Sequence, residues 1–174
     1  MKVVALLPMK GNSERVPNKN LKDFAGKPLY HRVMDVLLAS KYISNVVVNT
    51  DSEIIKADLK KHYGEKAIII DRPQEIIGDM VSMNKVIECD INNVSADLYL
   101  QTHSTNPLLK TKSVDDAIEK MIELLKGCSA RCAPRCIGSI SIDGQFAISY
   151  LLQNFLIYLI ARMFKKVNYT TRVN

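Results

Sequence analysis

Blocks of apolar and polar residues alternate regularly over the first 126 residues of the chain. Four short apolar runs are typical of strands buried on both faces of a sheet, and they lie at residues 3–8, 45–50, 67–70 and 98–100. Longer segments with helical spacing follow them, at residues 29–40, 51–63, 82–92 and 113–126. Repeated strand–helix units of this length predict an α/β fold with a mostly parallel sheet and helices on both faces.

Local signals place the ends of two of these helices. Thr50-Asp51-Ser52-Glu53 has Glu three residues after Thr, a capping-box pattern that predicts a helix running to about Tyr63. Gly64 suits the carboxyl-terminal cap of that helix. Ser113 suits the amino-terminal cap of the last helix.

Parallel sheets of this kind bind ligands in the loops at the carboxyl ends of their strands. The first such loop, residues 9–28, gathers cations and small polar groups: Lys10, Gly11, Asn12, Ser13, Arg15, Lys19 and Asn20. A triphosphate requires backbone N–H groups around it and Lys or Arg to neutralise its charge, and this loop can supply both. The spacing is neither that of a Walker P-loop nor G-x-G-x-x-G, so a solvated basic loop is an equal alternative from these residues alone.

Most of the net positive charge of the chain comes from residues 127–174. The 174-residue chain is 47% hydrophobic and 24% charged, as expected of a soluble globular domain, and its formal net charge is +6. Residues 1–126 hold 18 Lys and Arg against 17 Asp and Glu, whereas residues 127–174 hold 6 against 1. The body therefore offers no basic face for nucleic acid. Its first apolar stretch ends at Pro8 and is too short for a signal peptide, so we expect a cytoplasmic protein.

The first loop resembles the amino-terminal signature of the acylneuraminate cytidylyltransferase family. That signature reads P-A-R-x-G-S-K-G-(I/L)-x-x-K-N, and residues 8–20 read P-M-K-G-N-S-E-R-V-P-N-K-N. Lys10 stands where the family has Arg, Ser13 matches its Ser, and Lys19-Asn20 match its final K-N. The resemblance implies that these four residues contact the nucleotide phosphates, with Lys10 and Lys19 as the catalytic cations. Arg15 stands where the family has Gly and is a weaker match.

Three later stretches resemble the same family in the same order. Residues 49–53 are similar to S-T-D-x-E. Residues 71–82 are similar to R-P-x-E-L-A-x-D-x-A-S, the loop that holds cytosine, and this resemblance implies nucleotide contacts by Arg72, Asp79 and Ser82. From the bare residues, a surface ion pair of Arg72 and Asp79 is the alternative.

The last of these stretches, residues 100–108, resembles L-Q-P-T-S-P-L, in which the Gln faces the sugar. The resemblance implies sugar contacts by Gln101 and Thr105, although two extra residues lie between the Gln and the Pro. His103 in this loop is either a catalytic base or an ordinary loop histidine, and the pattern favours the second interpretation.

The resemblance implies a Rossmann-like three-layer sandwich, the nucleotide-diphospho-sugar transferase fold, over residues 1–126. It implies that an acylneuraminate-type acidic sugar attacks the α-phosphorus of CTP with Mg²⁺ as cofactor, giving a CMP-sugar and pyrophosphate. The alternatives are a related enzyme acting on 3-deoxy-manno-octulosonate and a catalytically inactive nucleotide-binding remnant. No membrane or nucleic-acid partner is expected. Family enzymes form homodimers through an arm that is not recognisable in this sequence.

Residues 127–174 depart from the family. They lack its D-S-x-x-S-V strand and its acid-bearing Mg²⁺ segment, and Asp143 is their only acid. The composition break favours a change of reading frame near Lys126, in which case this tail is not family sequence. Cys128, Cys132 and Cys136 fit incidental thiols in a reducing cytoplasm better than a metal site.

The uncharged stretch 146–161 within this tail admits two further interpretations. A membrane-facing helix with a basic flank is one, but the stretch is short for a span and holds Gln153 and Asn154 in its middle. A buried or partner-binding helix is the other.

Overall fold

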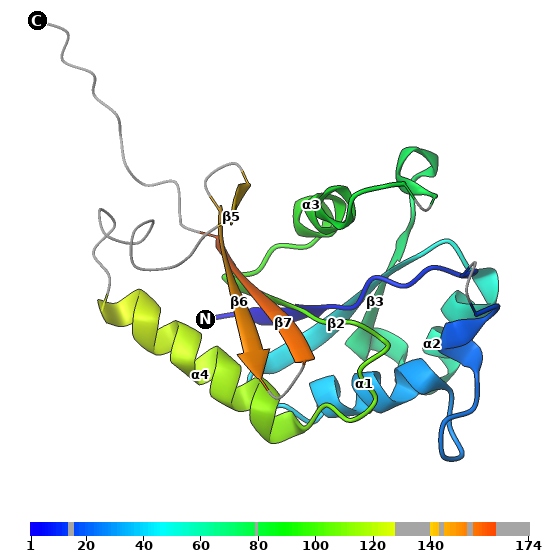
Figure 1. Cartoon of the computed structure of the whole chain (residues 1–174), viewed down its shortest axis with the longest axis horizontal. Coiled ribbons are helices and arrows are strands. Elements are labelled where there is room, and N and C mark those ends of the chain that lie inside the picture. Colours follow the sequence, from blue (N-terminus) through cyan, green and yellow to red (C-terminus); the bar gives the residue numbers. More distant parts are fainter. Residues whose placement is uncertain (14–15, 79, 128–139, 143–144, 153–154, 163–174) are drawn as a thin grey trace, which may run out of the picture.

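One twisted sheet forms the centre of the protein. The computed structural model describes residues 1–13, 16–78, 80–127, 140–142, 145–152 and 155–162. Within these residues the sheet has seven strands in the order β3-β2-β1-β4-β7-β6-β5 (Figure 1). Arg15, Asp79 and the three clustered cysteines, Cys128, Cys132 and Cys136, lie outside the described residues.

The four expected strands form the parallel part of the sheet. They are β1 (Val3–Leu6), β2 (Ile43–Thr50), β3 (Ala67–Asp71) and β4 (Leu98–Gln101). β1 lies in the middle and pairs in parallel with both β2 and β4, while β3 pairs with the far side of β2. The apolar runs in the sequence therefore correspond to strands that are covered on both faces, as predicted.

The expected helices are α1 (Leu29–Leu38), α2 (Glu53–Tyr63), α3 (Met83–Asn93) and α4 (Thr111–Gly127). Short 3₁₀ helices lie in the connections at Lys19–Leu21, Gly64–Lys66 and Gln74–Ile76. Figure 1 shows α1, α2 and α4 on one side of the sheet and α3 on the other. This is the predicted three-layer arrangement.

The core divides into two layers because successive strand residues point to opposite faces. Along β1 and the residue after it, Val3, Ala5 and Leu7 belong to one buried cluster, whereas Val4 and Leu6 belong to the other. Residues of α1, α2 and α4 complete the first cluster, and residues of α3 complete the second. Helices cover both faces of the sheet, which explains why β1 is apolar at every position.

Two predicted helix caps are wrong. α2 is capped by Ser52, whose hydroxyl accepts a hydrogen bond from Ile55 N at 3.4 Å, because Thr50 is still part of β2. α4 begins at Thr111, so Ser113 lies inside it and does not cap it. Gly64 does end α2, with a positive φ of 52°, as predicted.

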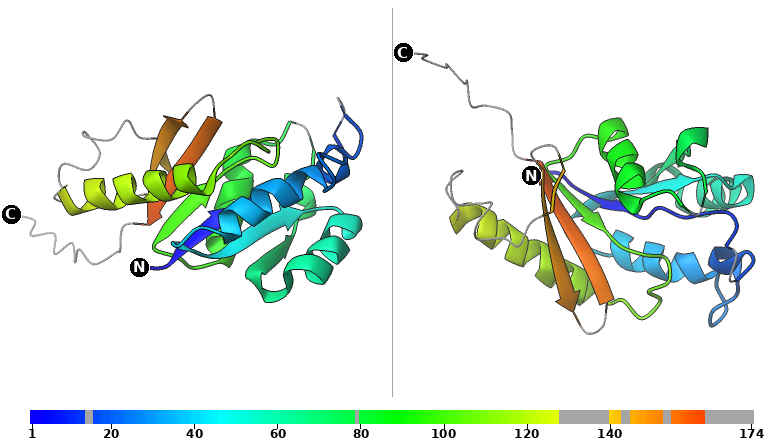
Figure 2. Two further views of the ribbon diagram at one scale, coloured as in Figure 1. Left: turned by 90° about the horizontal axis from the view of Figure 1, so that it is seen from below. Right: turned by 45° about the horizontal axis from the view of Figure 1, so that its top comes forward.

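The tail adds antiparallel strands to the edge of the parallel part. β5 (Ile140–Ile142), β6 (Gln145–Leu152) and β7 (Phe155–Arg162) follow one another, and β7 pairs with β4 (Figure 2). Both helical interpretations of residues 146–161 are therefore wrong. These strands are rich in Ile, Phe and Tyr, which favour strands, and β4 presents an edge with which they pair. Of the helices described, none has both the length and the apolar character that a membrane span requires.

Candidate functional site

A cavity of about 540 Å³ opens at the carboxyl ends of β1 and β4. It brings together five residues from the predicted site, and these are Lys10, Ser13, Lys19, Asn20 and Thr105. The other described lining residues are Pro8, Met9, Val16, Met83, His103 and Ser104. The cavity therefore lies between the first loop and the loop after β4, at the edge of the sheet where ligands are expected.

Hydrogen bonds to β2 and to the residue after it hold the beginning of the first loop in place. After β1 ends, Leu7 N and Met9 N still donate to Val47 O and Asn49 O, at 2.8 and 2.9 Å. Gly11 N then donates to the Asp51 carboxylate at 2.6 Å. A Cβ on Gly11 would lie 2.8 Å from the Cβ of Ser52, so only glycine lets the loop pass this close to the start of α2.

Asn20 joins the two sides of the cavity. Its side-chain amide nitrogen donates to Lys10 O at 2.9 Å, and its side-chain oxygen accepts from the Ser104 hydroxyl at 2.7 Å. Asn20 and Ser104 are both buried. The predicted nucleotide-binding Asn20 thus fixes the positions of Lys10 and of the loop after β4.

Two ammonium groups give the cavity its charge. Lys10 Nζ donates to Gly78 O at 2.8 Å, and Lys19 begins the first 3₁₀ helix.

Burial, and then the nearby charge of Lys19, lower the pKa of His103, so this imidazole is neutral at neutral pH. Sequence reasoning did not select His103 as a site residue, and only its place in the loop after β4 could have indicated it.

Arg72 lies beneath the first loop and not among the described lining residues. Its Nε donates to Asn49 Oδ1 and one terminal nitrogen donates to Asn49 O, both at 2.8 Å, with a longer contact of 3.5 Å to Met9 O. Burial lowers the pKa of Arg72. The guanidinium predicted to read cytosine is therefore engaged with the backbone that carries the loop.

Asp90 on α3 completes this buried network. Asn49 Nδ2 donates to Asp90 Oδ1 at 2.6 Å, while Asp90 Oδ2 is buried and has no partner among the described residues. Burial raises the pKa of Asp90 to about 7, although the Asn49 hydrogen bond and the charge of Arg72 oppose the shift.

Four other predicted residues lie apart from the described lining of the cavity, and these are Gly11, Asn12, Ser82 and Gln101. Asn12 is exposed and accepts from Ser13 N at 3.0 Å. Ser82 caps α3 by accepting from Asn84 N at 3.2 Å. Gln101 is buried and donates to Thr102 O at 3.2 Å.

Comparison with known proteins decides the family. The family model described as cytidylyltransferase matches residues 4–129. The chain belongs to this family. The predicted family and fold are thereby confirmed, and the cavity lies within the matched residues.

Named relatives are pseudaminic acid and 3-deoxy-manno-octulosonate cytidylyltransferases. The Campylobacter jejuni pseudaminic acid cytidylyltransferase is 33% identical over 129 residues, covering 71% of this chain and 54% of the relative. The Francisella tularensis 3-deoxy-manno-octulosonate cytidylyltransferase is 27% identical over 118 residues, covering 68% and 45%. The chain spans about half the length of the curated relatives it matches.

Solved structures share the fold. A CMP:2-keto-3-deoxy-manno-octonic acid synthetase complexed with CTP has a TM-score of 0.60 and 25% identity, over 71% of this chain and 48% of that one. A Leptospira borgpetersenii cytidylyltransferase has a TM-score of 0.56 and 19% identity, over 92% and 60%. The second similarity includes part of the tail, but it concerns the fold alone. The altered reading frame stays a prediction.

The contact of Gly11 with Ser52 yields a testable prediction. Gly11→Ala should lower the free energy of unfolding by about 1–3 kcal/mol, because the added methyl group overpacks the loop against Ser52. Urea denaturation measures the change. Adding Ser52→Gly should restore most of the loss, since glycine at a helix N-cap costs only a few tenths of a kcal/mol. A double variant as unstable as Gly11→Ala would show that the clash is elsewhere.

The buried carboxyl of Asp90 predicts a pH dependence of stability. Between its ordinary pKa of 3.8 and about 7, the unfolded state loses this proton while the folded state keeps it. Rising pH therefore destabilises the fold through Asp90, by at most about 1.4 kcal/mol per pH unit. Asp90→Asn removes this cost.

The stability of Asp90→Asn relative to the wild type should increase from pH 4 to pH 7, as measured by urea denaturation at each pH. The exposed Asp116 provides the control, and Asp116→Asn should show no comparable increase. A difference between Asp90→Asn and the wild type that is independent of pH would contradict the assignment.

Proposed function

We propose that this chain binds CTP and belongs to an enzyme that couples CTP to a nonulosonic acid, releasing pyrophosphate. The observation that carries the proposal is the shared cavity of Lys10, Ser13 and Lys19. The relatives named above support the choice of nucleotide, and pseudaminic acid is the sugar named for the relative that is 33% identical. A cytoplasmic location and a homodimer are part of this proposal.

The charge of the cavity suits a polyphosphate. Lys10 and Lys19 supply two cations, and none of the described lining residues carries a carboxylate. Ser13, another lining residue, carries a hydroxyl that can donate a further hydrogen bond. An anion of this charge is stabilised by ammonium groups and N–H donors acting together.

In the proposed reaction, a sugar hydroxyl oxygen forms a bond to the α-phosphorus of CTP. The bond from that phosphorus to the oxygen bridging it to the β-phosphorus breaks, pyrophosphate leaves, and the hydroxyl proton passes to a base. Little covalent chemistry is required of the protein, so alignment and charge neutralisation dominate. Lys10 and Lys19 would hold the phosphates and neutralise the charge that develops on pyrophosphate.

The family resemblance also implies Mg²⁺, and the described lining residues do not by themselves fit that ion. Mg²⁺ prefers oxygen ligands, usually one or two carboxylates with phosphates and water. The described part of the cavity wall offers hydroxyls, an amide, an imidazole and ammonium groups instead. Among these described lining residues, Lys10 and Lys19 are therefore the ones that neutralise negative charge.

The loop after β4 supports a sugar on the other side of the cavity. Thr105 lines the cavity. Nearby in the chain, Gln101 Oε1, Thr102 Oγ1 and Asn106 Oδ1 are buried without a partner among the described residues. Buried polar atoms require hydrogen bonds, and a polyhydroxylated sugar is a ligand that supplies them. A 3-deoxy-manno-octulosonate substrate satisfies the same chemistry and is the related alternative.

A nucleotide-binding remnant without turnover is a second candidate. The observation that favours it is the described lining of the cavity, which holds two lysines but no carboxylate for Mg²⁺. Catalysis in this family would then require groups beyond the matched residues, whereas nucleotide binding would require only the cavity.

Replacing one lysine tests the phosphate role. Lys19→Ala should weaken CTP binding about 10–100-fold, the loss expected for a charge-assisted contact, as measured by calorimetric titration in the presence of Mg²⁺. Lys22, three residues later, is exposed and does not line the cavity, so Lys22→Ala is the matched control. Equal affinity of the two variants, both folded by circular dichroism, would remove Lys19 from the phosphate site.

Turnover separates the two candidates. Pyrophosphate release is measured with CTP, Mg²⁺ and a panel containing pseudaminic acid, other nonulosonic acids and 3-deoxy-manno-octulosonate. Release with one of these sugars identifies the enzyme and its substrate. CTP binding without release identifies the remnant, and failure to bind CTP contradicts both candidates.

A further inference from the structure

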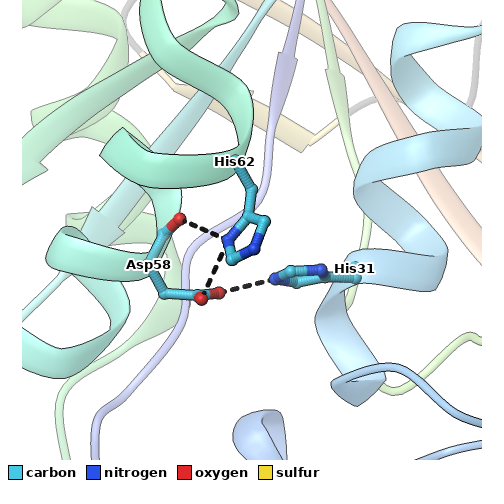
Figure 3. A group of neighbouring side chains, drawn as sticks. All are labelled: His31, Asp58 and His62. Carbon is cyan, nitrogen blue, oxygen red and sulfur yellow. Dashed lines mark hydrogen bonds and ion pairs between the residues drawn. The ribbon is translucent and has the colours of Figure 1, made fainter.

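A second group of ionisable side chains lies between α1 and α2, away from the nucleotide cavity. His31 comes from α1, whereas Asp58 and His62 lie one turn apart on α2 (Figure 3). Both imidazoles contact the Asp58 carboxylate. His31 Nε2 lies 2.6 Å from Oδ2, and His62 Nδ1 lies 3.0 Å from Oδ1. None of the three is among the described residues that line the cavity.

The surroundings of the group orient it. His31 is buried, and the rings of Tyr30, His62 and Tyr63 pack edge-on against its imidazole at 4.5, 5.1 and 5.2 Å between centroids. The Tyr30 hydroxyl donates to the same Asp58 oxygen that contacts His31. Asp58 is therefore held in place by contacts from both helices.

Two imidazoles and one carboxylate are a transition-metal donor set. One ligand atom from each residue can be chosen so that all lie within 4.8 Å of one another. Zn²⁺ binds His nitrogen and Asp oxygen at about 2.0–2.2 Å, with protein ligands on three of its four positions when the fourth is open. The present separations are those of hydrogen bonds, so an ion would take the place of the shared protons. His62, with 44% of its side chain exposed, has room to turn.

We propose that His31, Asp58 and His62 form a binding site for a divalent transition-metal ion, Zn²⁺ foremost, that links α1 to α2. The hydrogen bond from Tyr30 to Asp58 is the kind of outer contact that orients a metal ligand. The site differs from a catalytic Mg²⁺ site, because Mg²⁺ prefers oxygen ligands to imidazole. Its effect is on stability, since the ion ties together two helices that cover one face of the sheet.

The consequence for the nucleotide cavity is indirect. The first loop, residues 9–28, runs directly into α1, and α2 begins two residues after Asp51, which holds Gly11. An ion between the two helices therefore supports both ends of the first loop without touching a bound nucleotide. The proposal does not depend on the proposed function, because metal binding is measured without CTP.

Zn²⁺ titration of the whole chain tests the site, and the three histidines of the sequence supply a matched control. His62→Gln should weaken Zn²⁺ binding at this site by on the order of 100-fold, since even outer-shell substitutions cost 10–100-fold. His103→Gln, which removes the histidine outside the group, should leave the affinity unchanged. Zn²⁺ should also raise the thermal midpoint of the wild type and of His103→Gln more than that of His62→Gln.

Cys89 and the three tail cysteines are competing Zn²⁺ ligands, and Co²⁺ distinguishes them. Nitrogen and oxygen ligation gives a Co²⁺ spectrum without the thiolate charge-transfer band that cysteine produces. Asp58→Asn is the second variant, because its side-chain oxygen still accepts hydrogen bonds and so keeps the fold. Loss of the thiolate-free Co²⁺ spectrum in both His62→Gln and Asp58→Asn supports the proposal. Wild-type Zn²⁺ affinity in both variants, or thiolate ligation alone, overturns it.

Discussion

The arrangement of the site depends on the hydrogen bonds that the Arg72 guanidinium donates. It follows β3, donates twice to Asn49 at the end of β2, and reaches Met9 O just after β1. Asn49 in turn donates to Asp90 of α3. Three parallel strands and the helix on one face are therefore tied at one edge of the sheet. A buried cation is stable only with such partners, so the network fixes where the first loop begins.

From that starting point, the cavity is shaped by contacts from two directions. On the β2 side, Asp51 holds Gly11, and the absence of a side chain there brings the loop against the start of α2. On the β4 side, Asn20 holds Lys10 O and Ser104. Lys10 and Lys19 consequently line one cavity although the loop is irregular. The backbone of the first loop brings these two positive charges into the cavity. They are not part of a wider basic surface, since residues 1–126 are nearly neutral overall.

The sequence predicted the parallel strands and the cavity-lining part of the first loop, because both depend on local patterns. Continuous apolar runs mark strands buried on two faces, and the carboxyl ends of such strands meet at one edge. The position of Arg72 was not predictable, because a cation in a loop looks the same whether it faces a ligand or lies under the backbone. The cap at Ser52 was missed because Thr50 satisfies the same pattern while belonging to β2. His31 lies 27 residues from Asp58, and only the packing of α1 against α2 brings them together.

The strands of the tail join the sheet beside β4. β4 is completely buried and needs a neighbour on the side away from β1, which β7 provides through main-chain hydrogen bonds. Main-chain pairing accepts many sequences, so β7 can extend the sheet although its sequence departs from that of the family. The pairing places Tyr158 opposite Gln101, at the end of β4 where the loop after β4 begins. In the proposed function, the residues that would hold the phosphates all precede α4, whereas those that would hold the sugar lie beside a strand of the tail. A change in the tail would therefore reach the second group before the first.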